Sequence, residues 1–325
     1  MNLKKSKHII SINDCTPSLI DSLFEKTRER LQHHRKYRVW RTEQQIRGLL
    51  FALFYEPSSR TRFSFEIAAR ELGMNVLSTE DAAKFSSAAK GERLEDSIRV
   101  FCDFGATCIA LRHNENDAAE RAARVIDEYG YNTLVINSGS GTLEHPTQAL
   151  IDLFTIEKHL GRKDNIRIAF CGDLRYGRTV KSLTKLLSHY KTANIFFVAP
   201  EEFQITDDIK VMLIDKKIPF SKMYDIRDAL PYIDVLYMTR IQKERFTHEI
   251  PNMEKFRLTV ESIKDLLPHA IILHPMPRND EIDYDIDKDI RAIYFDQSSY
   301  GIPIRMSLME MLLKPVEEDS MAANN

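Results

Sequence analysis

The feature that most constrains this chain is a regular alternation between short apolar runs and longer amphipathic segments. The apolar run 49–55 follows a segment with helical periodicity that opens at Thr16-Pro17 and extends to about residue 33. A second helical pattern, 61–72, follows the run and ends at Gly73, a residue that favours a left-handed helix cap. Short buried strands separated by helices are typical of α/β proteins with parallel sheets.

The alternation continues along the chain, and it predicts two similar domains. We expect a mostly parallel sheet flanked by helices in each domain, with the active site in the interdomain cleft, beyond the carboxyl ends of the strands. The charged stretch 161–165 is the expected hinge between residues 1–160 and 161–301, and the C-terminal helix within 302–325 is expected to pack back on the first domain. The later elements are expected at these positions: helix 92–104, strand 108–112, helix 117–129, strand 133–137, helix 146–159, strand 166–171, helix 178–189, strand 194–198, helix 207–217, strands 234–238 and 270–273, and helix 302–313.

Composition excludes several classes of protein. The 325 residues carry 46 Lys+Arg against 48 Asp+Glu, a net charge of −2 that gives no overall field for nucleic acid or an anionic membrane. The longest apolar run, 49–55, is far shorter than the roughly 20 residues that cross a bilayer. The four cysteines form neither a Cys-x-x-Cys pair nor a zinc-site pattern, so we expect buried thiols, no metal, and a cytoplasmic protein.

The segment 54–62, Phe-Tyr-Glu-Pro-Ser-Ser-Arg-Thr-Arg, lies between an expected strand and an expected helix. Ser58, Ser59, Arg60 and Thr61 would then occupy a helix N-terminus, where free N–H groups and the helix dipole favour an anion. The hydroxyls and a guanidinium add donors that suit a phosphate. A Walker loop is absent. The alternative is a serine cap followed by solvated arginines.

Three further features of the first half carry polar groups near strand ends. His145 precedes an expected helix, which disfavours its cationic form and suits a neutral donor to a carbonyl oxygen. Gln148 lies one turn later, and Arg112 ends the strand 108–112. Ser86 and Lys90 precede the helix 92–104. Taken singly, each has an ordinary structural interpretation: a packed histidine, a strand-end arginine, or a solvated loop.

The second half places basic residues after three expected strands. Arg178 follows the strand 166–171 in a loop that lacks the dinucleotide-binding glycine pattern, and Arg240 and Gln242 follow the strand 234–238. Two arginine loops suggest a ligand with two carboxylates, each held bidentately. The segment His-Pro-Met-Pro-Arg, 274–278, contains two prolines that lack N–H donors, so its carbonyl groups are available to accept from an amine or amide.

Together these motifs resemble the aspartate/ornithine carbamoyltransferase family, in chain order from about Phe54 to Leu313. The Ser-x-Arg-Thr-Arg and His-Pro-x-Gln segments match the shared carbamoyl-phosphate motifs, and the second-half loops match the aspartate branch. The Asn-Asn-rich loop and Cys-Leu-Pro segment of ornithine enzymes are absent. Three positions depart from the usual pattern: Ser59 replaces Thr, Met276 replaces Leu, and Ser140 replaces the Asp of many relatives. None of the three removes an expected substrate contact.

The resemblance implies transfer of the carbamoyl group of carbamoyl phosphate to L-aspartate, the committed step of pyrimidine synthesis, with no cofactor. It implies catalytic roles for Thr61, Arg112, His145 and Lys90. For carbamoyl phosphate it implies Ser58, Ser59, Arg60, Thr61, Arg112, His145, Gln148, Met276 and Pro277. For aspartate it implies Lys90, Arg178, Arg240 and Gln242.

The resemblance also implies a homotrimer in which Ser86 and Lys90 reach the active site of a neighbouring subunit. A separate regulatory chain is left open. Three other functions remain as alternatives: a carbamoyltransferase with a different amine acceptor, a non-catalytic paralogue that binds a ligand or a partner chain, and a simple phosphate-binding module. Retention of Arg178 and Arg240 argues against a diamine or monocarboxylate acceptor, and an intact set of catalytic residues argues against a non-catalytic paralogue.

Overall fold

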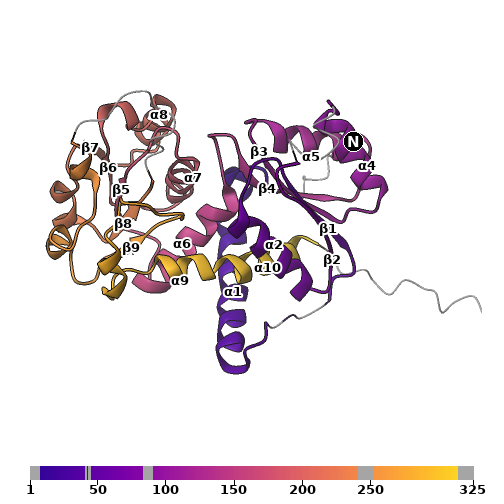
Figure 1. Cartoon of the computed structure of the whole chain (residues 1–325), viewed down its shortest axis with the longest axis horizontal. Helices are drawn as coiled ribbons and strands as arrows, with labels where there is room; N and C mark the ends of the chain where they lie inside the picture. The colour runs from indigo at the N-terminus through magenta and orange to yellow at the C-terminus, as the bar shows by residue number, and fades with distance from the viewer. Residues whose placement is uncertain (1–7, 41, 43–44, 83–90, 241–251, 314–325) are drawn as a thin grey trace, which may run out of the picture. The chain divides into compact units, whose positions relative to one another are not determined.

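The computed structural model describes residues 8–40, 42, 45–82, 91–240 and 252–313 (Figure 1). The chain divides into two compact units, one with Met1–Thr147 and Gly301–Asn325 and the other with Gln148–Tyr300. The division lies in the first turn of α6 (Pro146–Leu160), and the expected hinge, 161–165, directly follows this helix. On the two sides of this division, Arg305 of the first unit donates to Thr147 Oγ1, and Gln148 donates to Asp152 of the second unit.

The first unit is built on a four-stranded parallel sheet in the order β2-β1-β3-β4. Alternate residues of each strand face opposite sides of the sheet. Phe51 and Leu53 of β1 share one hydrophobic cluster with Ile98 of α4 and Ala122 of α5. On the other side, α2 packs with α10, which also contacts α1 (Figure 1). The elements of this unit are η1 (Ile12–Asp14), α1 (Pro17–Tyr37), β1 (Leu49–Phe54), α2 (Ser59–Glu71), β2 (Asn75–Thr79), α4 (Leu94–Asp103), β3 (Cys108–His113), α5 (Ala118–Glu128), β4 (Leu134–Ser140) and α10 (Gly301–Leu312).

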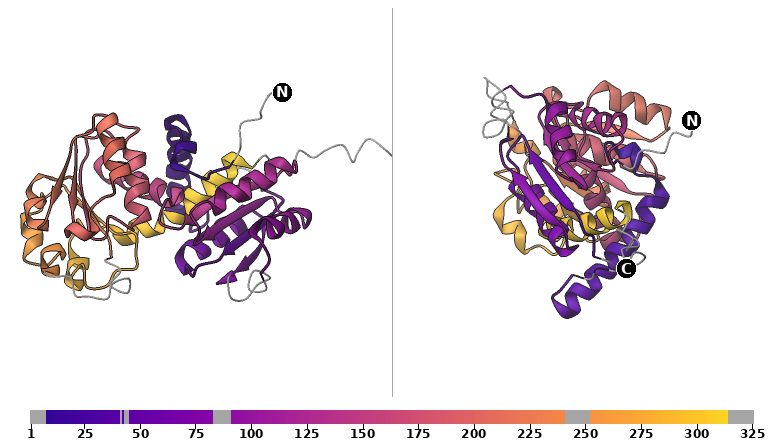
Figure 2. Two further views of the ribbon diagram at one scale, coloured as in Figure 1. Left: turned by 90° about the horizontal axis from the view of Figure 1, so that it is seen from above. Right: turned by 90° about the vertical axis from the view of Figure 1, so that its right-hand side faces the viewer.

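The second unit is built on a five-stranded parallel sheet in the order β7-β6-β5-β8-β9. Figure 2 shows that helices cover both faces of each sheet. On one face, Leu236 and Met238 of β8 pack with Ile226 and Leu230 of the preceding 3₁₀ segments. The remaining elements are β5 (Arg167–Cys171), α7 (Arg178–Leu187), β6 (Asn194–Val198), η3 (Glu201–Phe203), α8 (Asp207–Asp215), β7 (Phe220–Met223), η4 (Ile226–Asp228), η5 (Leu230–Tyr232), β8 (Val235–Met238), η7 (Met253–Phe256), η8 (Ser262–Asp265), β9 (Ile271–Leu273), η9 (Tyr284–Lys288) and α9 (Tyr294–Ser299).

The predicted fold class, two parallel sheets flanked by helices, is confirmed. Strand 194–198 agrees residue for residue, and most other elements agree within a few residues. The sequence missed β2 and β7, each of which forms one of the two edges of its sheet. Their side chains are largely exposed or half-buried, so neither strand shows the continuous apolar run that marks a central parallel strand. The short helix α9 was missed as well.

A buried ion cluster fastens α1 to α10 within the first unit. The Glu310 carboxylate lies 2.7 Å from Lys26 Nζ and 2.5 Å from an Arg30 guanidinium nitrogen. The Arg30 Nε donates to Ser307 Oγ at 3.1 Å. The Arg30 and Glu310 side chains are only 3% and 8% exposed, so removal of either one leaves the other charge buried.

We expect Glu310→Ala to lower the unfolding free energy of the first unit by about 3 kcal/mol and its Tm by roughly 6–12 °C. Burial alone would raise the pKa of Glu310, but Arg30 and Lys26 outweigh it and hold that pKa below its usual value of 4.5. The Glu310 carboxylate therefore contributes its full stabilisation above about pH 4.5, and this stabilisation is lost as the pH falls through the lowered pKa.

Thermal unfolding at neutral and acidic pH tests this expectation. The difference in Tm between the wild type and Glu310→Ala should be smaller at acidic pH than at neutral pH. Glu261→Ala is the matched control, because Glu261 pairs with Lys264 on the exposed surface. Equal shifts in Tm for the two variants would contradict the importance of the buried cluster.

Candidate active site

The segment after β1 leads into the N-terminus of α2. Ser58 is the N-cap of α2, and the first bond of the helix runs from Arg62 N–H to Ser58 C=O at 3.0 Å. The N–H groups of Ser59, Arg60 and Thr61 therefore precede the intrahelical ladder. The Ser58 side chain makes no cap hydrogen bond, so the helix does not use its hydroxyl group. This end of the helix offers several donors and the positive end of its dipole to an anion.

Sheet pairing brings Arg112 beside this helix start. Phe54 of β1 pairs with Arg112 of β3, and Tyr55 N–H donates to Arg112 C=O at 2.9 Å. The Arg112 side chain is 15% exposed, and its Nε lies 3.4 Å from the Glu56 carboxylate. Behind this pair, the ring of Tyr55 contacts that of His113, with centroids 4.5 Å apart. The guanidinium of Arg112 is thus held at the carboxyl end of the sheet next to a carboxylate.

His145 follows β4, the strand next to β3 in the first sheet. It lies between β4 and α6 and is nearly buried, with 4% exposure. The preceding residue, Glu144, accepts from Ile12 N–H at 2.7 Å and from Ser11 Oγ at 3.3 Å, so the N-terminal segment fixes this loop. Ser140, one of the three departures from the family pattern, is buried and donates to Asn137 Oδ1 at 3.1 Å. The serine therefore contributes to a loop that is internally hydrogen-bonded.

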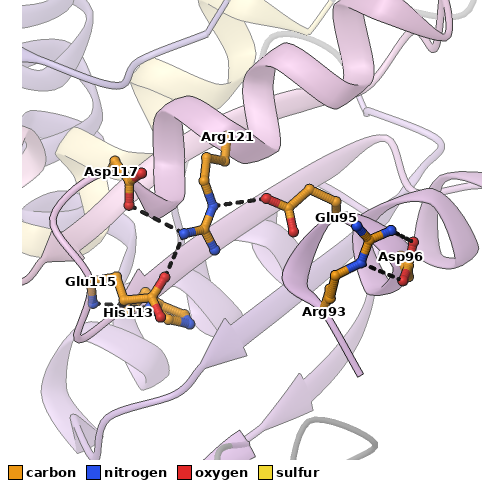
Figure 3. Close-up of polar contacts among 7 residues, drawn as sticks. All are labelled: Arg93, Glu95, Asp96, His113, Glu115, Asp117 and Arg121. Carbon is orange, nitrogen blue, oxygen red and sulfur yellow. Dashed lines mark hydrogen bonds and ion pairs between the residues drawn. The ribbon is translucent and has the colours of Figure 1, made fainter. Parts of the chain in front are cut away.

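A charged cluster fixes the loop that follows Arg112. Figure 3 shows the Arg121 guanidinium of α5 between Glu95 of α4 and the loop carboxylates Glu115 and Asp117. The distances from the guanidinium nitrogens to these carboxylates are 2.9, 2.6 and 3.3 Å, respectively. The same loop receives a hydrogen bond from Gly141 N–H to His113 C=O at 2.9 Å. The loops after β3 and β4 consequently support each other.

In the second unit, adjacent strands bring the two arginine segments together. Cys171 of β5 pairs with Met238 of β8, and Thr239 N–H donates to Cys171 C=O at 2.8 Å. Gly172 has a φ of +123°, and a Cβ atom placed on it would lie 2.2 Å from Thr239 O. This close approach places the segment leading to Arg178, the first residue of α7, against the segment that ends at Arg240. Two guanidinium groups from neighbouring strand ends suit a dicarboxylate.

The segment after β9 is fixed by a buried histidine. His274 is 1% exposed, its Nδ1 accepts from Met276 N–H at 2.8 Å, and its Nε2 donates to Glu281 at 2.7 Å. Burial would raise the pKa of Glu281, but the bond from His274 and nearby backbone donors outweigh it and lower that pKa. Met276 has a φ of +55° and precedes a cis bond to Pro277. Arg278 is bound by Asp287 and Tyr294.

The structure thus brings the sequence-predicted residues into two groups, one in each unit. Ser58 to Thr61, Arg112 and His145 belong to the first group. Arg178, Arg240, Met276 and Pro277 belong to the second, and Gln148 lies in the first turn of α6. Ser86, Lys90 and Gln242 lie outside the described residues.

Sequence reasoning missed Arg305, which supports the start of α6. Its side chain is 3% exposed, one guanidinium nitrogen donates to Thr147 Oγ1 at 3.2 Å, and the guanidinium lies over the ring of Phe65 of α2, 4.8 Å from its centroid. It thereby connects the two helices whose N-termini carry Ser58 and His145. The available signal was an arginine within the otherwise apolar stretch 302–306, which is unusual for a solvated residue.

Within the described ranges, no group of three or more His, Cys, Asp or Glu side chains is arranged to hold a metal ion. Among the helices that the structure describes, none combines the length and apolar character needed to cross a bilayer.

Comparison with known proteins assigns both halves of the chain to one family. The model for the carbamoyl-phosphate-binding domain of aspartate/ornithine carbamoyltransferases matches residues 7–158, and the model for the Asp/Orn-binding domain matches 164–312. The chain is 45% identical to aspartate carbamoyltransferase 2, chloroplastic, of Pisum sativum, over 91% of this chain and 76% of the relative. It is 43% identical to the aspartate carbamoyltransferase catalytic subunit of Methanocaldococcus jannaschii, over 96% and 99% of the two chains.

Solved structures give the same result. The catalytic subunit of the M. jannaschii aspartate transcarbamoylase matches with a TM-score of 0.83 and 41% identity, covering 94% of this chain and 97% of that chain. Aspartate transcarbamoylase from Trypanosoma cruzi in complex with carbamoyl phosphate and aspartate matches with a TM-score of 0.84 and 33% identity, covering 94% and 96%.

Substitution of Gly172 tests the close approach of the two arginine segments. We expect Gly172→Ala to lower the unfolding free energy of the second unit by about 2–4 kcal/mol, because backbone strain at positive φ adds to a backbone clash. Gly105→Ala is the matched control. Gly105 also has positive φ, but open space surrounds the added methyl group, so only about 1 kcal/mol of strain is expected. Thermal unfolding distinguishes the two, and equal losses would contradict the packing argument.

Proposed function

Because the chain belongs to the aspartate/ornithine carbamoyltransferase family, we propose that it transfers the carbamoyl group of carbamoyl phosphate to the amine of L-aspartate. The products are N-carbamoyl-L-aspartate and phosphate, and the reaction commits its product to pyrimidine synthesis. One observation carries the proposal: the first sheet aligns the start of α2, Arg112 and the segment of His145 at the carboxyl ends of three parallel strands. The T. cruzi relatives were solved with carbamoyl phosphate, aspartate, and carbamoyl aspartate plus phosphate.

Carbamoyl phosphate would bind through its phosphate to the start of α2. Backbone N–H groups and the hydroxyls of Ser58, Ser59 and Thr61 are donors, and Arg60 adds a positive charge. The neighbouring Arg112 would bridge the phosphate and the carbonyl oxygen, sharing or exchanging its present Glu56 partner. The leaving group is then surrounded by preorganised positive charge.

The carbamoyl group needs donors at its oxygen and acceptors at its amide. His145 and Thr61 would donate to the carbonyl oxygen, where negative charge develops. Gln148 and the carbonyl groups of Met276 and Pro277 would accept from the carbamoyl NH₂ group. The hydrogen bond from Met276 N–H to His274, whose ring is itself held by Glu281, fixes the backbone that leads to these carbonyl groups and supports a fixed acceptor site.

Aspartate would be held through its two carboxylates by Arg178 and Arg240, which follow paired strands of the second sheet. Gln242 and Lys90 are proposed as further aspartate ligands by motif position. The neutral amine of aspartate attacks the carbamoyl carbon, the bond from that carbon to the phosphate oxygen breaks, and the departing phosphate takes the proton. Proximity and electrostatic stabilisation suffice for these steps, so we propose no cofactor and no metal.

We propose a homotrimer in which Ser86 and Lys90 act at the site of a neighbouring subunit. Support comes from the match of these positions to the family motif and from relatives named as catalytic subunits. A separate regulatory chain is compatible with those names. We further propose a cytoplasmic location, because the four cysteines are free and buried, as in a reducing compartment. The plant relatives carry names that place them in chloroplasts.

The direct test measures N-carbamoyl-L-aspartate formation by the purified chain, with L-ornithine as a competing acceptor. We expect turnover with aspartate alone and a loss of at least about 10³-fold in Arg112→Ala, which lacks the charge proposed at the developing oxyanion. Turnover with ornithine would indicate a different acceptor. A folded chain inactive with both acceptors would indicate a non-catalytic paralogue.

Shared sites predict complementation between two inactive variants. Lys90→Ala and Arg112→Ala damage the same site from different subunits, so mixing and reassembling the two chains should restore partial activity. The mixture is compared with each variant reassembled alone. An inactive mixture that contains mixed trimers, shown by native mass spectrometry, would place Lys90 in the site of its own chain.

A further inference from the structure

A buried carboxylate in α6 contacts one of the proposed ligands of carbamoyl phosphate. Asp152 is 0% exposed and lies in the otherwise apolar stretch 149–154, one turn after Gln148. Its Oδ1 accepts from Gln148 Nε2 at 2.8 Å and from Gln297 Nε2 of α9 at 2.7 Å. Its Oδ2 accepts from the hydroxyl of Tyr237 of β8 at 2.8 Å. All four residues belong to the second unit.

The direction of these hydrogen bonds follows from one unambiguous donor. The backbone N–H of His274 donates to Gln297 Oε1 at 2.9 Å, so the other end of that amide is its NH₂ group. Gln297 must therefore donate to Asp152 Oδ1, which makes this oxygen an acceptor. An oxygen of Gln148 placed 2.8 Å from the same atom would be repelled, so Gln148 also presents its NH₂ group to Asp152. Its carbonyl oxygen, Oε1, is then directed away from the carboxylate.

We propose that Asp152 is a positioning residue that fixes the amide of Gln148 so that its carbonyl oxygen accepts from the carbamoyl NH₂ group; this rests on the proposed function. A glutamine that rotates freely presents a donor or an acceptor with similar ease. With the rotation fixed, the site favours a carbonyl compound bearing an NH₂ group over one bearing a methyl group. Asp152 therefore contributes to substrate discrimination without touching the substrate.

The same network couples this acceptor to the other proposed acceptors. Gln297 bonds both to Asp152 and to the backbone N–H of His274, whose side chain orders Met276. Gln148 and the segment 274–277 are thus held through a single carboxylate. A buried carboxylate is costly to desolvate, and an apolar residue of similar size often serves packing as well or better. Packing therefore does not explain why this position of α6 carries an acid, whereas orientation of two amides does.

The test compares carbamoyl phosphate with acetyl phosphate, which replaces the NH₂ group by a methyl group and keeps the phosphate and the carbonyl. For Asp152→Leu we expect the KM for carbamoyl phosphate to rise about tenfold, equivalent to about 1.4 kcal/mol, while the inhibition constant of acetyl phosphate changes less than about twofold. Equal weakening of both ligands would show that Asp152 serves only the general structure of the site and would overturn the proposal.

Two further variants separate orientation from charge and stability. In Asp152→Asn, the amide oxygen can face both glutamines while its NH₂ group faces Tyr237 O, so we expect discrimination close to wild type. Tyr237→Phe removes a bond to the other carboxylate oxygen and should leave the ratio of the two constants unchanged. Loss of discrimination in either variant would overturn the proposal. Failure of wild-type turnover would instead count against the proposed function.

If Asp152→Leu does not fold, hydrogen exchange of side-chain amides in the wild-type chain tests the proposal. The side-chain NH₂ protons of Gln148 are assigned by their absence in Gln148→Ala. They should exchange with water more slowly than the NH₂ protons of Gln32, an exposed residue of α1. Protection by the carboxylate is expected with or without substrate. Exchange as fast as that of Gln32 would show that the amide is not fixed and would overturn the proposal.

Discussion

Parallel strand pairing is the constraint on which the functional regions of this chain depend. In a parallel sheet, the carboxyl ends of all strands meet at one edge, so segments far apart in the sequence become neighbours. Phe54 and Arg112 pair directly, although α2, β2 and α4 lie between them in the chain. The same rule brings Thr239 onto Cys171 in the second sheet. Each loop therefore needs only to follow its own strand for its polar side chain to reach the common edge.

This constraint explains why so much could be predicted from the sequence. The central strands contain continuous apolar runs, and the chemistry-bearing residues come directly after these runs, Arg112 at the end of β3 and Arg240 just beyond β8. The outer strands β2 and β7 are half exposed, and their sequences do not differ clearly from loops.

A second class of residues was missed for a different reason. Arg305 and Asp152 lie within short apolar stretches of their helices, and the sequence does not reveal their partners, since these come from distant elements. Their presence was nevertheless detectable. A charged residue with apolar neighbours on both sides in a helix is rarely solvated, so it needs a buried partner. A search for charged residues within apolar stretches of helices therefore finds both positions in the sequence, but it does not identify their partners.

The two classes differ in what a substitution should change. In the proposed mechanism, Arg112 and the donors at the start of α2 stabilise the charge that develops during the reaction, so we expect their loss to affect the rate directly. Asp152 accepts from Gln148 and Arg305 donates to Thr147, so we expect the loss of either to change the geometry of these neighbours rather than a charge at the reacting atoms. An amide illustrates the difference most clearly, because its two ends have nearly the same shape and opposite hydrogen-bonding character. Packing alone does not distinguish the two orientations of an amide, whereas a buried carboxylate with a fixed set of donors does.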